Sequence, residues 1–254
     1  MTRKLRLPTT ITLFLVISVA FLRGLPAPPA LPAQPAQPAA TAPPAPKAQQ
    51  RPPLFRPQDL GLIEPPDRDE WQKPDLIMDK LRIADGSSIG EVGAGGGWFT
   101  IRLARRVGPN GVVWAEDVQL VMVEFIGRRA QRENLPWVKA LAGTETDPRL
   151  PPKLDVVLIA FGYREMDDPT RPKDIVTLFA NAARSLKPQG CFGVVDFLPG
   201  SGGPGPEPQE RVAPEEVIKT ASAAGLNLLA RDTIPPFVYL LVFGKETSRC
   251  APSL

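Results

Sequence analysis

A glycine-rich segment between two apolar runs has residue types that can hold a ligand. Residues 91–97 read EVGAGGG. Gly93 and Gly95 permit a tight turn and a close approach of a ligand to the backbone. A helix that begins directly after such a turn directs its free N–H groups at that ligand. The simpler interpretation is that these glycines only connect a strand to a helix.

Two residues beside these glycines indicate which ligand suits the turn. The dinucleotide fingerprint needs a glycine at its sixth position, where this chain has Trp98, which is too large for close packing of helix on strand. Glu91, on the N-terminal side of the first glycine, would repel a pyrophosphate. The same carboxylate can pair with the cationic amino group of a methionine moiety. The pattern therefore favours a methionine-bearing nucleoside over a nicotinamide dinucleotide.

A second pair of acids follows the glycine turn. Glu116 and Asp117 end the next expected strand, where a carboxylate can accept hydrogen bonds from both hydroxyls of a ribose. We expect Asp117 rather than Glu116 to do so. Asp117 also precedes a helical run and can cap that helix, and the two roles are compatible.

The turn lies inside an alternating series of expected strands and helices. Short buried strands are expected at residues 88–92, 112–115, 138–141, 154–160, 190–197, 226–231 and 237–243. Helices are expected from Pro74 onward and at residues 98–107, 120–133, 175–186 and 214–224. Because right-handed βαβ crossovers imply parallel strands, we predict an α/β fold: a Rossmann-like three-layer sandwich whose mostly parallel seven-stranded sheet has an antiparallel last strand.

The residues outside this domain have other compositions. In residues 1–23, Arg3, Lys4 and Arg6 precede an apolar run at 11–22 that is short for a membrane span, which is typical of a signal peptide or signal anchor. Residues 24–58 form a Pro/Ala-rich spacer expected to be disordered. The folded domain is expected at 59–246, with a flexible tail at 247–254. We expect export to the periplasm or outside the cell, or a membrane tether through residues 7–22; a domain facing the cytoplasm is the third possibility.

The composition limits the metal sites, disulfides and partners that we expect. The chain has no histidine and two cysteines, so we expect no zinc or iron site, and no metal ligands are assigned. Cys191 falls in an expected strand and Cys250 in a polar tail, and we expect no disulfide between them. The net charge is +3, but basic and acidic residues are interleaved, so a nucleic-acid partner is not expected.

The order and spacing of several segments resemble the class I S-adenosylmethionine-dependent methyltransferase superfamily, and more closely a bacterial group of predicted methyltransferases that carry export signals. The segments are WQKPDLIMDKL, EVGAGGG, VVWAEDVQLVMVEFI, LAGTETDPRLPPKLDVVLIAF, SLKPQGCFGVVDF and RVAPEEVIKTASAAGL. The resemblance implies S-adenosylmethionine as cofactor and methyl transfer to an unidentified acceptor, with a small molecule favoured.

The resemblance also implies roles for individual residues. In that superfamily the first motif holds the methionine part, the end of the second strand the ribose, and the stretch after the third strand the adenine, while the end of the fourth strand borders the methyl group. An aspartate is commoner where Thr144 stands. The cofactor-binding candidates are Glu91, Gly93, Ala94, Gly95, Glu116, Asp117, Gly143, Thr144, Glu145, Ala160 and Phe161.

The chain departs from those relatives where a base is expected. They often carry histidines after the fourth strand and before the late helix, where this chain reads GYRE at 162–165 and QER at 209–211. Without a histidine, a carboxylate or a phenol with a shifted pKa would have to remove the proton of the acceptor. Otherwise the acceptor itself would have to be acidic. The weak catalytic candidates are Tyr163 and Asp196, followed by Glu165 and Glu210.

Two rival functions remain open from the sequence. A binding module that keeps the donor pocket without catalysis is motivated by the missing histidines. A nicotinamide-dependent oxidoreductase is disfavoured by Trp98. The Gly- and Pro-rich loop from Leu198 to Arg211 is expected to cover the acceptor side as a mobile lid, or to be a flexible connector.

Overall fold

The computed structural model describes residues 64–200, 202–245 and 248, all within one compact unit. The expected signal segment, spacer and most of the tail lie outside these residues. The described elements are α2 (Arg68–Gln72), α3 (Pro74–Lys80), β1 (Ser88–Val92), α4 (Trp98–Val107), β2 (Val112–Asp117), α5 (Leu120–Arg132), β3 (Val138–Ala142), β4 (Leu154–Ala160), α6 (Tyr163–Met166), α7 (Pro172–Arg184), β5 (Leu186–Phe197), the 3₁₀ helix η2 (Pro208–Glu210), α8 (Pro214–Ala223), β6 (Asn227–Ile234) and β7 (Val238–Gly244).

The strands form one seven-stranded sheet in the order β3-β2-β1-β4-β5-β7-β6. The pairs β2–β3, β1–β2, β1–β4 and β4–β5 are parallel, whereas β7 is antiparallel to both β5 and β6. The predicted fold class is therefore confirmed, including the antiparallel last strand. Because β1 to β5 run in one direction, their carboxyl ends meet at one edge of the sheet.

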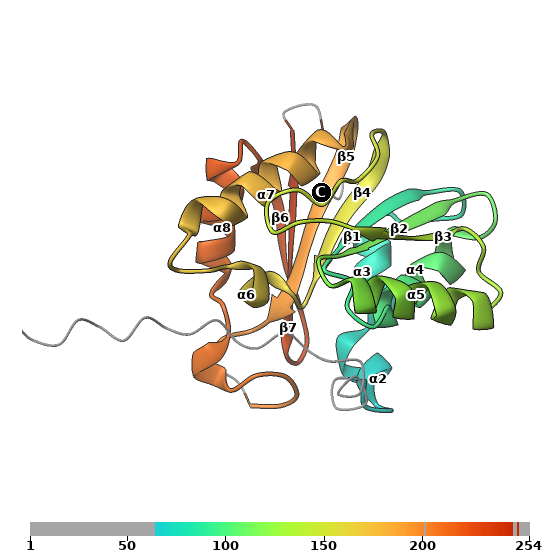
Figure 1. The fold of residues 1–254 in the computed structure, drawn as a ribbon. Coiled ribbons are helices and arrows are strands. Elements are labelled where there is room, and N and C mark those ends of the chain that lie inside the picture. The colour runs from blue at the N-terminus through green and yellow to red at the C-terminus, as the bar shows by residue number, and fades with distance from the viewer. Residues whose placement is uncertain (1–63, 201, 246–247, 249–254) are drawn as a thin grey trace, which may run out of the picture. The chain divides into compact units, whose positions relative to one another are not determined.

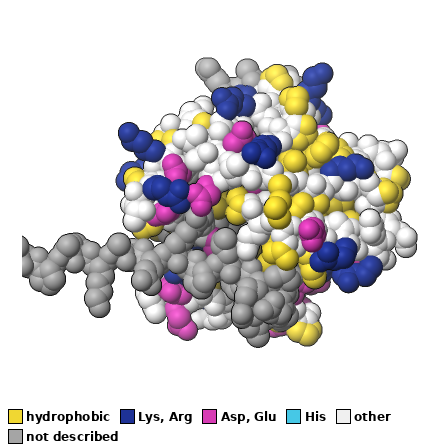
Figure 2. All heavy atoms as spheres, in the orientation of Figure 1, with side chains coloured by type: hydrophobic (Ala, Val, Ile, Leu, Met, Phe, Trp, Pro, Cys, Tyr) yellow, Lys and Arg dark blue, Asp and Glu magenta, His cyan; other side chains and the backbone are white. Residues whose placement is uncertain are grey.

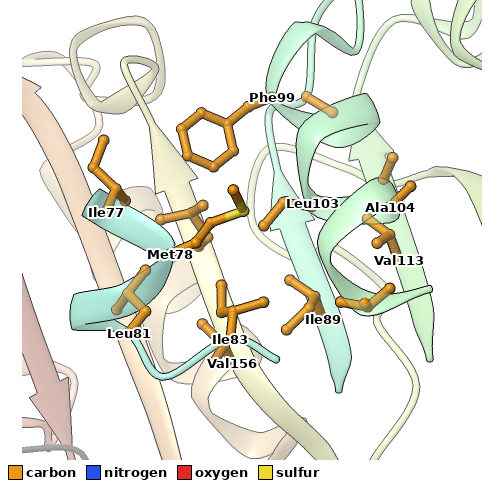
Figure 3. Packing of buried hydrophobic residues seen from close by; sticks show 14 of the residues in the cluster. Ile77, Met78, Leu81, Ile83, Ile89, Phe99, Leu103, Ala104, Val113 and Val156 are labelled. Carbon is orange, nitrogen blue, oxygen red and sulfur yellow. The ribbon is translucent and has the colours of Figure 1, made fainter. Parts of the chain in front are cut away.

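Helices cover both faces of the sheet, which gives three layers (Figure 1). One face packs against α3, α4 and α5, and the other against α7 and α8. Figure 3 shows side chains of α3, such as Met78, and of α4, such as Leu103, converging on Ile89 of β1. All three are at most 2% exposed. The helix α4 begins at the glycine turn, so this packing fixes the turn against the sheet.

Several elements differ from the expected ones for physical reasons. The short helices α2 and α6 were not expected, because the sequences RDEWQ and YREM are too short and too polar to show helical periodicity. The strand β5 begins at Leu186, inside the helix expected at 175–186, because α7 ends at Arg184 and the following residues pair with β4.

The expectation of no disulfide is wrong, because Cys191 is disulfide-bonded. The other cysteine of the chain, Cys250, lies outside the described residues. Cys191 on β5 lies opposite Gly244, the last residue of β7. Ser248 then donates from Oγ to the carbonyl of Gly190 at 2.9 Å, which keeps the chain beside β5 after β7 ends.

Charged side chains of both signs are interspersed on the face seen in Figure 2. Several of the basic side chains are held in ion pairs, as in Arg106 with Asp75 at 2.9 Å and Arg231 with Glu215 at 2.7 Å. Among the described residues, no helix has both the length and the apolar character needed to cross a membrane.

Candidate cofactor and active site

The glycine turn adopts the backbone conformation that its sequence predicts. Gly93, Gly95 and Gly97 have φ values of 70°, 55° and 75°, in the left-handed region that favours glycine. A Cβ added to Gly93 would lie 2.3 Å from the Met166 side chain, whereas one added to Gly95 would meet no atom within 4 Å. The turn is thus packed on one side at Gly93 and open at Gly95, where a ligand can approach the backbone.

Glu91 lies buried under this turn. Its side chain accepts a hydrogen bond at Oε2 from the Thr100 hydroxyl at 2.5 Å, and the residue is 2% exposed. Burial raises the pKa of Glu91 to about 7, while the Thr100 hydrogen bond and the positive charge of Arg68 oppose that rise. A cationic group bound nearby would favour the ionised carboxylate in the same way.

Asp117 connects the glycine turn to the end of β2. Its Oδ2 accepts the Gly95 N–H at 2.9 Å, and its Oδ1 accepts the Gln119 N–H at 2.8 Å. Burial raises the pKa of this carboxyl, and the two backbone hydrogen bonds oppose the rise. Each carboxylate oxygen can accept a second hydrogen bond, so the side chain can still receive ribose hydroxyls. The expectation that Asp117 caps α5 is wrong, because Gln119 is the N-cap, no side chain caps the helix, and near α5 Asp117 accepts only the N–H of Gln119 itself.

Glu116 faces the opposite side of β2 from Asp117, as alternate strand residues do. It is 1% exposed, and its Oε2 accepts the Gly93 N–H at 3.3 Å. A Cβ added to Gly143 would lie 2.0 Å from Oε1, so the carboxyl packs against the loop after β3. Burial raises the pKa of Glu116 to about 8. Glu116 therefore lies between the glycine turn and this loop.

Two of the expected adenine-binding residues have side chains that are already bonded to other parts of the protein. Thr144 accepts the Asp147 N–H at Oγ1 over 3.0 Å, and Glu145 pairs with Arg171 at 2.6 Å. The Gly143 N–H donates to the Asp117 carbonyl at 3.3 Å, which places this loop beside the ends of β1 and β2. A nucleoside base at this position would therefore meet mainly backbone groups.

Three aromatic rings meet beside the ends of β4 and β5. Trp71 of α2 lies with its ring centroid 6.1 Å from that of Phe161 and 5.6 Å from that of Phe197, and the two phenylalanines are 4.9 Å apart. Phe161 follows Ala160 directly and has a φ of 60°, which is uncommon for a residue other than glycine. The indole nitrogen of Trp71 is buried without a hydrogen-bond partner. Sequence reasoning identified Ala160 and Phe161 but missed Trp71.

The two favoured catalytic candidates lie in different settings. Asp196 is 6% exposed at the end of β5; its Oδ1 accepts the Phe197 N–H at 2.7 Å, and its Oδ2 has no partner. Burial raises the pKa of Asp196 to about 7. Tyr163 is 1% exposed, and its hydroxyl shares a 2.7 Å hydrogen bond with the Thr220 hydroxyl. Burial raises the pKa of Tyr163, so this phenol is a weaker candidate than Asp196.

The two other acids considered as bases are weaker candidates than Asp196. Glu210 is paired with Arg164 at 3.1 Å, which occupies its carboxylate. Glu165 raises the pKa of Asp196 through its negative charge. Among these acids, Asp196 combines burial with an oxygen that has no hydrogen-bond partner.

The helix α2 adds residues to the site that the sequence pattern did not reveal. The Arg68 guanidinium lies 4.1 Å from the centre of the Trp98 ring and donates from Nε to Gln72 at 2.6 Å. Gln72 is fully buried, and its Nε2 has no partner. Burial lowers the pKa of Arg68 to about 10. In the sequence, only the RDEW segment before Pro74 could have pointed to this helix. Its polar residues show no helical periodicity, so the helix was not predicted.

The loop from Leu198 to Arg211 is held by its last residue. The Arg211 guanidinium donates to the carbonyls of Pro206 at 3.0 Å, Pro204 at 3.0 Å and Leu198 at 3.1 Å. Arg211 is 8% exposed, and its guanidinium carbon lies 5.3 Å from the centre of the Phe197 ring. The loop is thus gathered around one buried cation, and its expected mobility and its expected place over the acceptor stay predictions.

The mostly parallel sheet, with antiparallel β7 and with a glycine turn and two acids at its carboxyl edge, has the fold of known methyltransferase structures. Residues 89–190 match the family described as "Methyltransferase domain". A methyltransferase structure from Aquifex aeolicus, described as SAM dependent, aligns with a TM-score of 0.67 at 24% identity, over 74% of this chain and 98% of that one. The geranyl diphosphate C-methyltransferase from Streptomyces coelicolor aligns with a TM-score of 0.55 at 16% identity, over 76% and 85%.

Curated proteins that the chain resembles are also named as methyltransferases. The ubiquinone/menaquinone biosynthesis C-methyltransferase UbiE of Hahella chejuensis is 30% identical over 132 residues, and the demethylmenaquinone methyltransferase of Lactobacillus johnsonii is 28% identical over 130. Each alignment covers 50% of this chain and 49% of the relative, so the chain spans about half the length of these proteins. Residues 89–190 therefore match a methyltransferase domain, and the fold is that of a solved methyltransferase structure described as SAM dependent.

Proposed function

We propose that the chain is an enzyme that transfers the methyl group of S-adenosylmethionine to a small-molecule acceptor. One observation carries the proposal: Asp117 is bonded to the open glycine turn, above the buried carboxylate of Glu91. This arrangement offers one acid to an amino group and another to a ribose, at the same edge of the sheet. The match of residues 89–190 to a methyltransferase domain supports the same donor.

The residues at this edge fit the donor. The open side of Gly95 leaves room for a ligand against the backbone. Glu91 would attract the amino group of the methionine part, and Asp117 would receive the ribose hydroxyls. Gln72 offers a buried amide donor without a partner, which suits a carboxylate. When bound, the donor supplies a methyl group that its sulfonium already makes electrophilic.

The chain's own residues would then align the acceptor and remove its proton. Trp71, Phe161 and Phe197 form an apolar aromatic group beside the strand ends, which favours a mainly apolar acceptor and excludes water. Asp196, with its unpartnered oxygen, is the proposed base. A base whose pKa lies near the working pH is the most effective kind. The names of the relatives, which concern ubiquinone, menaquinone and geranyl diphosphate, support a small acceptor.

Calorimetric titration tests this proposal directly. S-adenosylmethionine and S-adenosylhomocysteine should bind the wild-type chain, and NAD should not. Donor turnover is then measured with a small-molecule extract of cells, with boiled protein as control. Donor affinity without turnover would favour the binding module, and binding of NAD alone would overturn the proposal.

We also propose that the domain works in an oxidising compartment outside the cytoplasm. Basic residues before an apolar run, such as Arg3 and Lys4, are typical of an export signal. Disulfides persist mainly in exported proteins, and Cys191 is disulfide-bonded. A reporter enzyme fused after Leu254 should be active only on the outer side of the membrane. Activity on the cytoplasmic side would contradict export.

A further inference from the structure

In the part of the chain that the structure describes, four buried side-chain atoms lack a hydrogen-bond partner, and two of them are N–H donors on α2. These two are the indole nitrogen of Trp71 and the amide nitrogen of Gln72. Buried polar groups in proteins are nearly always hydrogen-bonded, so an exception beside a binding site can mark the place of a ligand atom. Gln72 has a proposed role toward the donor, and Trp71 is left without one.

The surroundings of the Trp71 ring are apolar. The ring packs against Phe161 and Phe197 and against the hydrophobic core between the sheet and α3 and α4. A buried water molecule at the indole nitrogen would need about two to four polar partners, which these rings do not supply. By contrast, the indole of Trp137 donates to the Ala104 carbonyl at 2.7 Å. The free N–H of Trp71 therefore suits a ligand that brings its own acceptor atom on an apolar body.

The two free N–H donors of α2 point in different directions, because neighbouring residues on a helix do not share a face. Gln72 accepts a hydrogen bond from Arg68, whose guanidinium lies 4.1 Å from the ring centre of Trp98, the first residue of α4 after the glycine turn. Trp71 instead packs against Phe161, which follows the end of β4. The amide of Gln72 thus belongs to the donor side, and the indole of Trp71 belongs to the side of the aromatic rings.

The two phenylalanine rings beside Trp71 are held by the backbone around them. The Phe161 N–H donates to the Val195 carbonyl at 2.8 Å, and Phe161 keeps a φ of 60°. The Phe197 ring packs against the loop after β5, since a Cβ added to Gly205 would overlap this ring. The aromatic rings therefore form an apolar surface of fixed shape. A single N–H beside such a surface can select among apolar ligands through one hydrogen bond.

We propose that Trp71 donates its indole N–H to an oxygen atom of the methyl acceptor, and that Trp71 is thereby a specificity-determining residue. The acceptor is then a mainly apolar, ring-containing molecule that carries a carbonyl, hydroxyl or ether oxygen, because a ring can pack on the aromatic side chains. A ligand of the same shape without the oxygen leaves the N–H unsatisfied and binds more weakly. The identity of this ligand as the acceptor rests on the proposed function, whereas the hydrogen bond can be measured by binding alone.

NMR of the ¹⁵N-labelled full-length chain, saturated with S-adenosylhomocysteine, tests the hydrogen bond. The chain has four tryptophans, so four indole N–H signals are followed. The probes are 1-tetralone and tetralin, two bicyclic molecules of similar shape of which only the first has a carbonyl oxygen. We expect 1-tetralone to move the Trp71 indole proton downfield and tetralin not to do so. The signal of Trp137, whose N–H is already bonded within the protein, should stay in place with both probes.

The variant Trp71→Phe keeps an aromatic ring and removes the N–H. The ratio of the affinity for 1-tetralone to that for tetralin should fall about tenfold in this variant. The ratio should keep its wild-type value in Trp137→Phe, the matched control. A ring that merely packed less well would weaken both probes alike and leave the ratio unchanged. Thermal midpoints check the fold of both variants. If Trp71→Phe does not fold, the wild-type shift decides, with the Trp71 signal assigned through contacts to the Phe161 ring protons.

Three results would overturn the inference: an unmoved Trp71 signal with bound 1-tetralone, an unchanged affinity ratio in Trp71→Phe, or failure of 1-tetralone to bind. Failure of S-adenosylhomocysteine to bind would instead count against the proposed function, and the two probes would then be compared in its absence. Binding of S-adenosylhomocysteine without selection for the carbonyl probe separates failure of this inference from failure of the proposed function.

Discussion

The Asp117 carboxylate accepts the Gly95 N–H at 2.9 Å, so an acid from the end of β2 holds the middle of the glycine turn that follows β1. The contact joins residues that lie 22 positions apart in the chain. It requires parallel strands with adjacent carboxyl ends, which β1 and β2 provide. The same carboxylate is proposed to receive the ribose of the donor, so turn geometry and donor binding are coupled through one side chain.

Replacing Asp117 tests this coupling. Asp117→Ala should weaken S-adenosylhomocysteine binding by about 1.5–3 kcal/mol, the range for lost hydrogen bonds to a charged group. Asp117→Asn should lose less, because one amide oxygen can still accept. Calorimetry gives the affinities, and Asp75→Ala on the exposed face of α3 serves as control. An affinity unchanged in Asp117→Ala would place the ribose elsewhere.

Asp196 should determine the pH dependence of turnover. As a base it acts when ionised, so the rate should rise with pH through about 7, the pKa to which burial raises this carboxyl, and then level off. Asp196→Asn should lower kcat by about 10²–10⁴-fold without changing donor affinity. Donor affinity measured at each pH separates this effect from the titration of Glu91, whose pKa burial also raises to about 7. A variant with wild-type kcat and pH profile would show that the acceptor needs no base from Asp196.

Glu116 should make the fold less stable at high pH. Burial raises its pKa from 4.5 to about 8 in the folded chain, so the folded state binds the proton more tightly than the unfolded state. The free energy of unfolding then falls as pH rises from about 4.5 to about 8. Glu116→Gln should reduce this fall, as seen in urea unfolding at pH 5 and pH 8.5. Glu124→Gln on the exposed face of α5 is the control, and an identical pH dependence in both variants would contradict the assignment.

Arg211 should hold the loop after β5. Arg211→Lys keeps the charge but cannot donate to three separated carbonyls at once, so the loop should open. We expect a loss of about 1.5–3 kcal/mol in unfolding free energy, since the loop carbonyls lose a charged hydrogen-bond donor. Limited proteolysis should cut within residues 198–210 in the variant and not in wild type. Arg231→Lys, whose guanidinium forms an exposed ion pair, is the matched control. Equal resistance of both variants would show that other contacts hold the loop.

The sequence predicted the elements whose apolar periodicity is strong. The bounds of β1, α4 and β4 agree with the expected ones, because each is a buried run ended by turn residues. The contribution of α2 to the site could not be predicted. Arg68 and Gln72 reach the site only because α2 packs beside the glycine turn. The unpartnered oxygen of Asp196 likewise depends on long-range packing that no local pattern encodes.

The disulfide at Cys191 can be tested chemically. The test also distinguishes an oxidising compartment outside the cytoplasm from the cytoplasm. In the folded, oxidised chain an alkylating reagent should modify no cysteine, and after denaturation and reduction it should modify both cysteines of the sequence. Cys191→Ser should lower the free energy of unfolding by about 2–4 kcal/mol under oxidising conditions and leave it nearly unchanged in reductant. Mass spectrometry of alkylated peptides and urea unfolding provide the two readouts. A free Cys191 thiol in protein isolated from its own cells would contradict both the disulfide and the oxidising compartment.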